Sequence, residues 1–210
     1  MFTLPSLEEI DSDGAIQDTR AAFLKKAGIG AGALLGGGAF FGALPTLAGA
    51  ATAKSDVAIL NYALTLEYLE AAFYDDAVSG GALKGDVAKF ARIVAAHENA
   101  HVAALKGALG RAAVAKPKFD FKGATTSQKK FMATAQVLED TGVAAYLGQV
   151  GNIKSKQVLA AAGSILPVEA RHAGWIRELN GVSGAPAAFE GGKTKAQILK
   201  AVTGTGFIVG

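Results

Sequence analysis

Cysteine is absent from this chain of 210 residues, and histidine occurs only three times. The absence of cysteine excludes a disulfide framework and any metal site built from thiolates. It also excludes a lipid-modified cysteine after an export signal. Any transition-metal site in this protein must therefore be built from histidine nitrogens and carboxylate oxygens.

Charged side chains are absent from residues 27–53, which begin with the apolar sequence AGIGAGALLGGGAFFGAL directly after Lys25 and Lys26. A basic flank followed by an apolar run is typical of an export signal. The run is rich in glycine and only weakly hydrophobic, which disfavours a stable membrane-spanning helix. The pattern therefore predicts an exported protein of the periplasm or cell envelope, and an uncleaved segment that anchors the chain in the membrane is the alternative.

Small residues follow the apolar run and offer two A-x-A cleavage sites, at residues 48–50 and 51–53. We therefore assign residues 1–53 to the export signal and expect the mature chain to begin near Ala51 or Lys54. The stretch TRAAFLKK before the run resembles a twin-arginine export signal. It departs from that pattern because Ala21 stands where the second arginine belongs.

The mature part carries only a modest excess of positive charge. Residues 54–210 contain 18 Lys and Arg against 13 Asp and Glu. The densest basic region, residues 116–130, reads as a solvated connection rather than a nucleic-acid surface. We therefore predict no nucleic-acid partner.

Apolar residues recur at helical spacing in four long segments, residues 55–78, 86–109, 127–149 and 155–179. Short Gly-rich or polar turns separate the first pair and the second pair, so each pair is expected to form a hairpin. The irregular residues 110–126 are long enough to run the length of a bundle. The predicted fold is all-α: a four-helix bundle over residues 54–180, made of two helical hairpins joined by a long crossover. Residues 181–210 are expected to form a C-terminal tail, in which residues 193–210 allow one short helix.

Three residues mark expected helix boundaries. Ser55 and Asp86 are candidate N-caps for the first two helices. Pro167 lies inside the fourth segment and should bend or restart that helix just before Glu169.

An internal repeat relates the two hairpins. The sequence LEYLEAAFY, residues 66–74, aligns without a gap with LEDTGVAAY, residues 138–146. The alignment pairs two glutamates and two tyrosines, namely Glu67 with Glu139 and Tyr74 with Tyr146. The chain therefore looks like one hairpin used twice.

Each hairpin also contains a Glu-x-x-His sequence at a matching distance. Glu98 follows the first glutamate of its hairpin by 31 residues, and Glu169 follows the corresponding glutamate by 30. A histidine follows each of them after three residues, as His101 and His172. Residues at i and i+3 share a helix face, so each sequence can present a carboxylate and an imidazole to one ion.

Antiparallel packing of each hairpin brings its two glutamates to the same height. Four carboxylates and two imidazoles around a bundle axis form an oxygen-rich site suited to two iron or manganese ions. The predicted metal ligands are Glu67, Glu98, His101, Glu139, Glu169 and His172.

This arrangement resembles the ferritin-like superfamily of di-iron and di-manganese carboxylate proteins, whose pattern is Glu, Glu-x-x-His, Glu, Glu-x-x-His on four successive helices. The stretches LNYALTLEYLEAAFY and ILPVEARHAGWI are similar to exported ferritin-like-domain proteins sometimes grouped with desiccation-related proteins. The resemblance implies a metal centre that reacts with dioxygen, peroxide or Fe(II), in the manner of a ferroxidase, catalase or peroxidase, in stress protection. The alternative is a non-enzymatic structural or stress-related envelope protein with a vestigial metal site. The sequence leaves the oligomeric state open, a homo-oligomer included.

The sequence allows two interpretations for the role of several residues near the predicted ligands. Glu70 lies one turn after Glu67 and is its rival as the ligand from the first helix. Tyr74 and Tyr146 lie two turns after their glutamates, where they either pack in the core or hydrogen-bond a ligand. His97 points about 100° away from Glu98, which favours a solvated or helix-packing side chain over a ligand.

Overall fold

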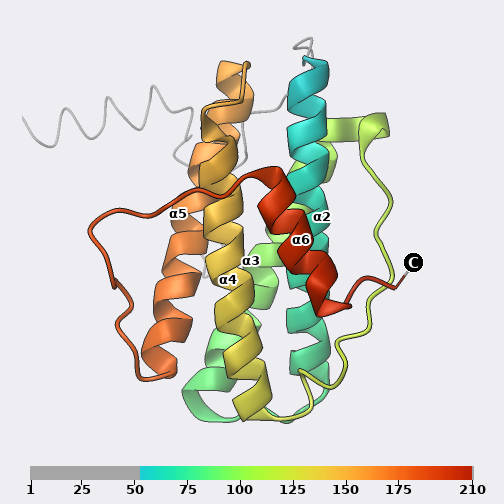
Figure 1. Cartoon of the computed structure of the whole chain (residues 1–210). Coiled ribbons are helices and arrows are strands. Elements are labelled where there is room, and N and C mark those ends of the chain that lie inside the picture. The colour runs from blue at the N-terminus through green and yellow to red at the C-terminus, as the bar shows by residue number, and fades with distance from the viewer. Residues whose placement is uncertain (1–52, 210) are drawn as a thin grey trace, which may run out of the picture. The chain divides into compact units, whose positions relative to one another are not determined.

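The computed structural model describes residues 53–209, and these residues form helices and one isolated β-bridge (Figure 1). The elements are α2 (Lys54–Ser79), α3 (Gly85–Leu109), the short 3-10 helix η2 (Gly110–Ala112), α4 (Gln128–Val150), α5 (Lys156–Leu179) and α6 (Lys195–Thr205). The predicted all-α bundle of two hairpins and a crossover is confirmed. The predicted export signal and its cleavage sites lie outside the described residues and stay predictions.

The two hairpins are α2 with α3 and α4 with α5, and each is closed by a short turn. The connection between α3 and α4 runs beside α2 from one end of the bundle to the other (Figure 1). The second hairpin therefore starts at the same end of the bundle as the turn of the first. This placement brings the middle of all four helices to one level.

The predicted N-caps of the first two helices are wrong, whereas serine caps begin the other two. Helix α2 starts after Ala53 and α3 after Lys84, neither with a side-chain cap. Ser127 and Ser155, in contrast, accept the N–H groups of the first turns of α4 and α5. Near the start of α2, the carboxylate of Asp56 instead accepts N–H groups at the start of α5.

Pro167 does not restart α5, which continues from Lys156 to Leu179 around it. A proline inside a helix removes one hydrogen bond and costs about 3 kcal/mol. Buried residues lie on both sides of it, among them Ile165 and Ile176. Their packing holds both halves of the helix in place, because helices in proteins are stabilised mainly by their buried face.

The hydrophobic core consists of two clusters, one on each side of the middle of the bundle along its long axis. One is aromatic, with the rings of Phe73 and Phe131 stacked at 5.3 Å and Phe90 edge-on to Trp175 at 5.2 Å. The other is mainly aliphatic and lies toward the start of α2; it includes Leu60, Leu64, Leu105, Val158 and Ile165. The region between the two clusters holds the polar residues described in the next section.

The C-terminal tail is an ordered part of the fold. Helix α6 buries Ile198 and Val202 against the aromatic cluster. Beyond it the chain pairs with the crossover, where the N–H of Asp120 donates to the carbonyl of Phe207 at 2.9 Å. The tail thereby fastens the crossover to the bundle. None of the helices within residues 53–209 is both long and apolar enough to cross a membrane.

Asp56 joins the two hairpins at one end of the bundle. Its side chain is fully buried, and its carboxylate accepts the N–H groups of Lys154, at 3.0 Å, and Ser155, at 2.8 Å. These two groups lead into α5, so the carboxylate fixes the start of that helix against α2. The carboxylate provides a hydrogen-bond acceptor for two backbone N–H groups that would otherwise be buried without one.

Replacing Asp56 by alanine is expected to lower the free energy of unfolding by about 3 kcal/mol, because two backbone N–H groups lose a charged acceptor. Urea unfolding followed by circular dichroism measures the change. The matched control is Asp86→Ala, which removes an exposed acid from the first turn of α3. Equal losses in the two variants would contradict the structural role assigned to Asp56.

Candidate metal centre

Four glutamates from four helices meet in the middle of the bundle, and each is 0 % exposed. They are Glu67 on α2, Glu98 on α3, Glu139 on α4 and Glu169 on α5. Of the 13 Asp and Glu in residues 54–210, six are buried, including these four. A buried ionised carboxylate costs several kcal/mol unless it is paired, protonated or bound to a metal ion. The centre of this bundle therefore requires positive charge.

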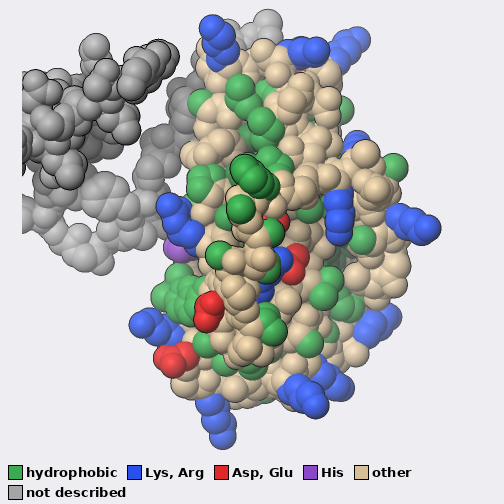
Figure 2. All heavy atoms as spheres, turned by 60° about the vertical axis from the view of Figure 1, so that its left-hand side comes forward, with side chains coloured by type: hydrophobic (Ala, Val, Ile, Leu, Met, Phe, Trp, Pro, Cys, Tyr) green, Lys and Arg blue, Asp and Glu red, His purple; other side chains and the backbone are tan. Residues whose placement is uncertain are grey.

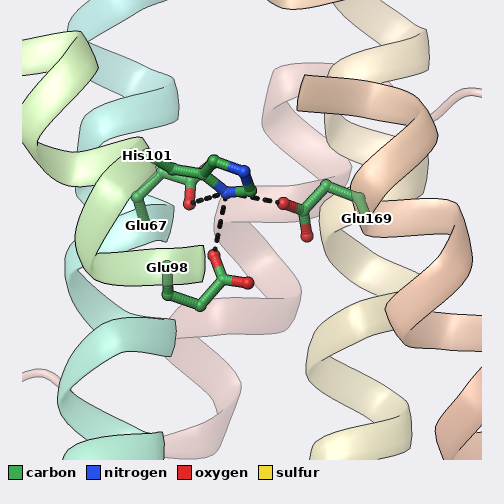
Figure 3. A group of neighbouring side chains, drawn as sticks. All are labelled: Glu67, Glu98, His101 and Glu169. Atoms are coloured by element: carbon green, nitrogen blue, oxygen red, sulfur yellow. Dashed lines mark hydrogen bonds and ion pairs between the residues drawn. The ribbon is translucent and has the colours of Figure 1, made fainter. Parts of the chain in front are cut away.

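The first group of side chains surrounds His101 (Figure 3). Its Nδ1 atom lies 3.2 Å from Glu67 Oε2, 3.2 Å from Glu98 Oε2 and 3.0 Å from Glu169 Oε1. These carboxylates come from α2, α3 and α5, so both hairpins contribute to the group. Figure 3 shows the three oxygens turned toward the same ring nitrogen.

The second group surrounds His172 on α5. Its Nδ1 atom lies 3.0 Å from Glu98 Oε1 and 3.4 Å from Glu139 Oε2. Glu98 therefore turns one oxygen toward each histidine. The repeat relates Glu139 and Glu98 of this group to Glu67 and Glu169 of the first, but among the described residues His172 forms no ion pair with Glu169, the counterpart of Glu98.

The two groups share two of their members. One set of donor atoms within 4.8 Å of one another comes from Glu67, Glu98, His101 and Glu169. The other comes from Glu98, Glu139, Glu169 and His172. Glu98 and Glu169, the glutamates of the two Glu-x-x-His sequences, belong to both sets. All six predicted ligands are thus brought together around two adjacent positions.

Several buried oxygen and nitrogen atoms in this centre form no hydrogen bond of good geometry within the described part of the chain, although some lie 3.0–3.4 Å from a charged neighbour. They are Glu98 Oε1, Glu139 Oε2, both carboxylate oxygens of Glu169 and His172 Nδ1. Buried polar atoms in folded proteins nearly always form hydrogen bonds, so a group of buried oxygen and nitrogen atoms without them requires an explanation. Carboxylate oxygens with imidazole nitrogens form a donor set that accepts iron or manganese. The residues present fit a metal centre of this kind.

Burial and the neighbouring charges shift the pKa values of the centre in opposite directions. Burial raises the pKa of Glu98, as does Glu169 beside it; burial and Glu67 raise the pKa of Glu169 to about 7. Burial also opposes ionisation of Glu67, but the charge of His101 outweighs it, and the pKa of Glu67 is lowered. Burial alone would lower the pKa of His101, but the negative charge of Glu67 and the hydrogen bonds of His101 to the surrounding carboxylates raise it. In the absence of metal, protons supply the positive charge.

The two tyrosines of the repeat reach across to the opposite hairpin. The hydroxyl of Tyr74 donates to Glu139 Oε1, and that of Tyr146 donates to Glu67 Oε1. Both rings are also part of the core. Core packing and hydrogen bonding are therefore compatible roles for both tyrosines, because the ring packs in the core while the hydroxyl donates to a glutamate. Burial raises the pKa of each tyrosine, followed by the effect of its glutamate partner, so both stay protonated donors.

His97 contacts the centre in a way that the sequence does not indicate. Its Nδ1 atom lies 2.8 Å from Nε2 of His172, and the two rings are nearly parallel with centroids 5.1 Å apart. This contact orients the Nδ1 atom of His172 toward Glu98 and Glu139. A helical wheel of α3 alone places His97 off the ligand face. Only the packing of α3 against α5 brings the two rings together.

Glu70, the rival of Glu67, is also buried, with 4 % of its surface exposed. Glu67 belongs to the donor set around His101, whereas Glu70 belongs to neither donor set. Glu67 and Glu70 therefore do not compete for one position, because both side chains are buried in the bundle.

An apolar cavity of about 20 Å³ lies beside the centre, toward the aliphatic cluster. Tyr146 forms part of its wall, together with Ala63, Leu66, Leu105 and Ala162. A space of this size holds a molecule about as large as water. Tyr146, whose hydroxyl donates to Glu67, separates the cavity from the centre.

One face of the molecule contrasts with this acidic interior (Figure 2). Figure 2 shows one face of the molecule, where Lys and Arg side chains are spread around the edge and few Asp or Glu side chains are visible. Asp140, next to Glu139 in the sequence, accepts a hydrogen bond from Arg177 Nε at 2.9 Å. Asp140 is thus paired with an arginine outside the centre, whereas the glutamates of the centre contact the histidines and the two tyrosines.

The fold and the buried side chains define the class of this protein: a four-helix bundle with a carboxylate and histidine centre at its middle. A family model for the ferritin-like domain matches residues 55–182, which include all six predicted ligands. The chain belongs to the ferritin-like domain family. No curated protein shows significant sequence similarity to it.

Proposed function

We propose that this protein binds two iron or manganese ions in a dinuclear centre and uses them in a redox reaction with dioxygen, peroxide or Fe(II). The observation that carries the proposal is the pair of donor sets that share Glu98 and Glu169. Two sets with two common carboxylates match the requirement of two adjacent ions for bridging ligands. The buried oxygen and nitrogen atoms without hydrogen bonds support the same conclusion.

Each side chain has a position that suits one task. Glu98 and Glu169 lie between the two sets and would bind both ions. His101 with Glu67 would complete one end of the centre, and His172 with Glu139 the other. The symmetry of the repeat makes the two ends chemically similar.

Iron or manganese in such a centre supplies two-electron redox chemistry, one electron from each ion. The chain orients the carboxylates for it, since Tyr74 and Tyr146 each hold one oxygen of a terminal glutamate. Partners of this type tune the orientation and basicity of metal ligands. The complete burial of the four glutamates also keeps bulk water away from the centre.

The cavity beside Tyr146 supports a small substrate. Its volume of about 20 Å³ and its apolar wall suit an uncharged molecule of two or a few atoms. Dioxygen and hydrogen peroxide are of this size. The apolar wall suits dioxygen better than it suits hydrogen peroxide or Fe(II), which both need polar partners.

The test is an assay of the metal-loaded protein for Fe(II) oxidation in air and for disproportionation of hydrogen peroxide to water and dioxygen. One of the two rates is expected to exceed that of the double variant Glu139→Ala, His172→Ala by at least about tenfold, because the variant loses one end of the centre. Fe(III) absorbance and an oxygen electrode measure the rates. Protein that carries two metal ions yet consumes neither reactant would rule out the redox function and favour a structural role.

A further inference from the structure

Gly142 on α4 leaves a space inside the centre that a carboxylate of another helix fills. A Cβ atom at position 142 would lie 3.1 Å from Glu70 Oε1 and 3.3 Å from Glu169 Oε2. The carboxylates of Glu70 and Glu169 therefore approach the same point on α4. A side chain at position 142 would require both carboxylates to shift by a few tenths of an ångström, because contacts of 3.0–3.4 Å are tighter than most Cβ contacts in proteins.

The internal repeat explains how this space arises. The alignment that pairs Glu67 with Glu139 also pairs Glu70 with Gly142, each one turn after its glutamate. One hairpin carries a carboxylate at this position, and the other carries no side chain at all. The carboxylate of the first occupies the volume that a side chain of the second would fill. The centre is thus asymmetric at this position, although its six predicted ligands follow the repeat.

Within residues 53–209, no cationic side chain forms an ion pair with Glu70. The histidines of the described residues pair with Glu67, Glu98, Glu139 and Glu169, and none of those ion pairs includes Glu70. Its side chain is only 4 % exposed, and its carboxylate lies beside that of Glu169 at Gly142. A carboxylate enclosed among other carboxylates requires either a proton or a metal ion.

We propose that Glu70 is a seventh metal-binding residue, a fifth carboxylate that acts beside Glu169 in the centre. This inference rests on the proposed dinuclear centre. Four carboxylates balance the charge of two divalent ions, so a fifth adds attraction for the ions that the other residues hold. The absence of a side chain at Gly142 is the structural condition for this arrangement.

Titration with Mn²⁺ tests the inference, with free Mn²⁺ measured by its electron paramagnetic resonance signal. The wild-type protein is expected to bind two ions, and Glu70→Gln to bind one of them at least about tenfold more weakly, because an amide is a poor substitute for a carboxylate ligand. Glutamine has the shape of a protonated glutamate, so the variant should fold. The matched control is Glu190→Gln, which removes an exposed carboxylate and should bind as the wild type does.

Gly142→Ala provides a second, independent test, because it displaces the Glu70 and Glu169 carboxylates without changing any charge. It is also expected to weaken the binding of one ion, and circular dichroism establishes that both variants are folded. Two ions bound with unchanged affinity in Glu70→Gln, or in folded Gly142→Ala should the first variant not fold, would overturn the role of Glu70 alone. Absence of binding by the wild-type protein would overturn the dinuclear centre itself, and the inference with it.

Discussion

Metal content is expected to fall from two iron or manganese ions per chain to none when Glu98 and Glu169 are both replaced by glutamine. These two residues belong to both donor sets, so the double variant removes the carboxylates that would join the ions. Elemental analysis of protein produced in medium supplemented with iron and manganese measures the effect. Retention of two ions by the double variant would show that the metals bind elsewhere.

The same variant is expected to be more stable than the wild-type protein when both are free of metal at neutral pH. Burial and neighbouring carboxylates raise the pKa of Glu169 from 4.5 to about 7, which disfavours its ionised form. Each pKa unit corresponds to 1.36 kcal/mol, so removing this ionisation contributes on the order of 3 kcal/mol. Burial raises the pKa of Glu98 too, which adds in the same direction. The double variant would then bind less metal than the wild-type protein, but its metal-free form would be more stable.

Urea unfolding of chelator-treated protein measures this second effect, with Glu190→Gln as the control for loss of one exposed carboxylate. The control should leave both metal content and stability near the wild-type values. A double variant that lost its metal and was also less stable would indicate that the glutamates hold the bundle together rather than the metal.

The metal-free protein is expected to lose stability as the pH rises from about 5 to about 8. The pKa of Glu169 is 4.5 in the unfolded chain and about 7 in the folded one. Between these values the folded state binds more protons than the unfolded state, so the free energy of unfolding falls with rising pH. His101 acts in the same direction above pH 6.5, because its pKa is raised in the folded state. The lowered pKa of Glu67 affects stability only at lower pH.

Thermal unfolding in the presence of a chelator measures this dependence, and the shift from Glu169 alone amounts to roughly 6–12 °C. Saturating Mn²⁺ should reverse the trend, because metal ions replace the protons and bind better as the pH rises. The variant with Glu98→Gln and Glu169→Gln should show a smaller slope. A metal-free stability that rose over this pH range would contradict the assigned charges.

Much of the centre could be predicted from the sequence because its members are related by spacing along helices and between repeats. Glu98 and His101 share a helix face at any tertiary arrangement, since the geometry of an α-helix places i and i+3 together. The matching distances in the two hairpins then brought Glu67 and Glu139 to the same level. The fold followed from the same periodicity, and its helices lie within a few residues of the predicted segments.

Other features could not be predicted because they depend on how helices face one another. The contact of His97 with His172 requires a particular rotation of α3 against α5. The continuity of α5 through Pro167 depends on packing on both sides of the proline. Asp56 caps a turn 98 residues away, which no local pattern indicates.

The sequence by itself determined the helices, the repeat and the identity of the six predicted ligands, because these follow from the period of the α-helix and from distances along the chain. Only the tertiary structure decided which side chain meets which across the bundle. Each repeat tyrosine lies two turns from the glutamate of its own helix but donates to the glutamate of the other hairpin. Glu70 likewise reaches the space beside Gly142 on α4. Such pairings depend on the rotation and register of packed helices, which are set by the close packing of the whole core.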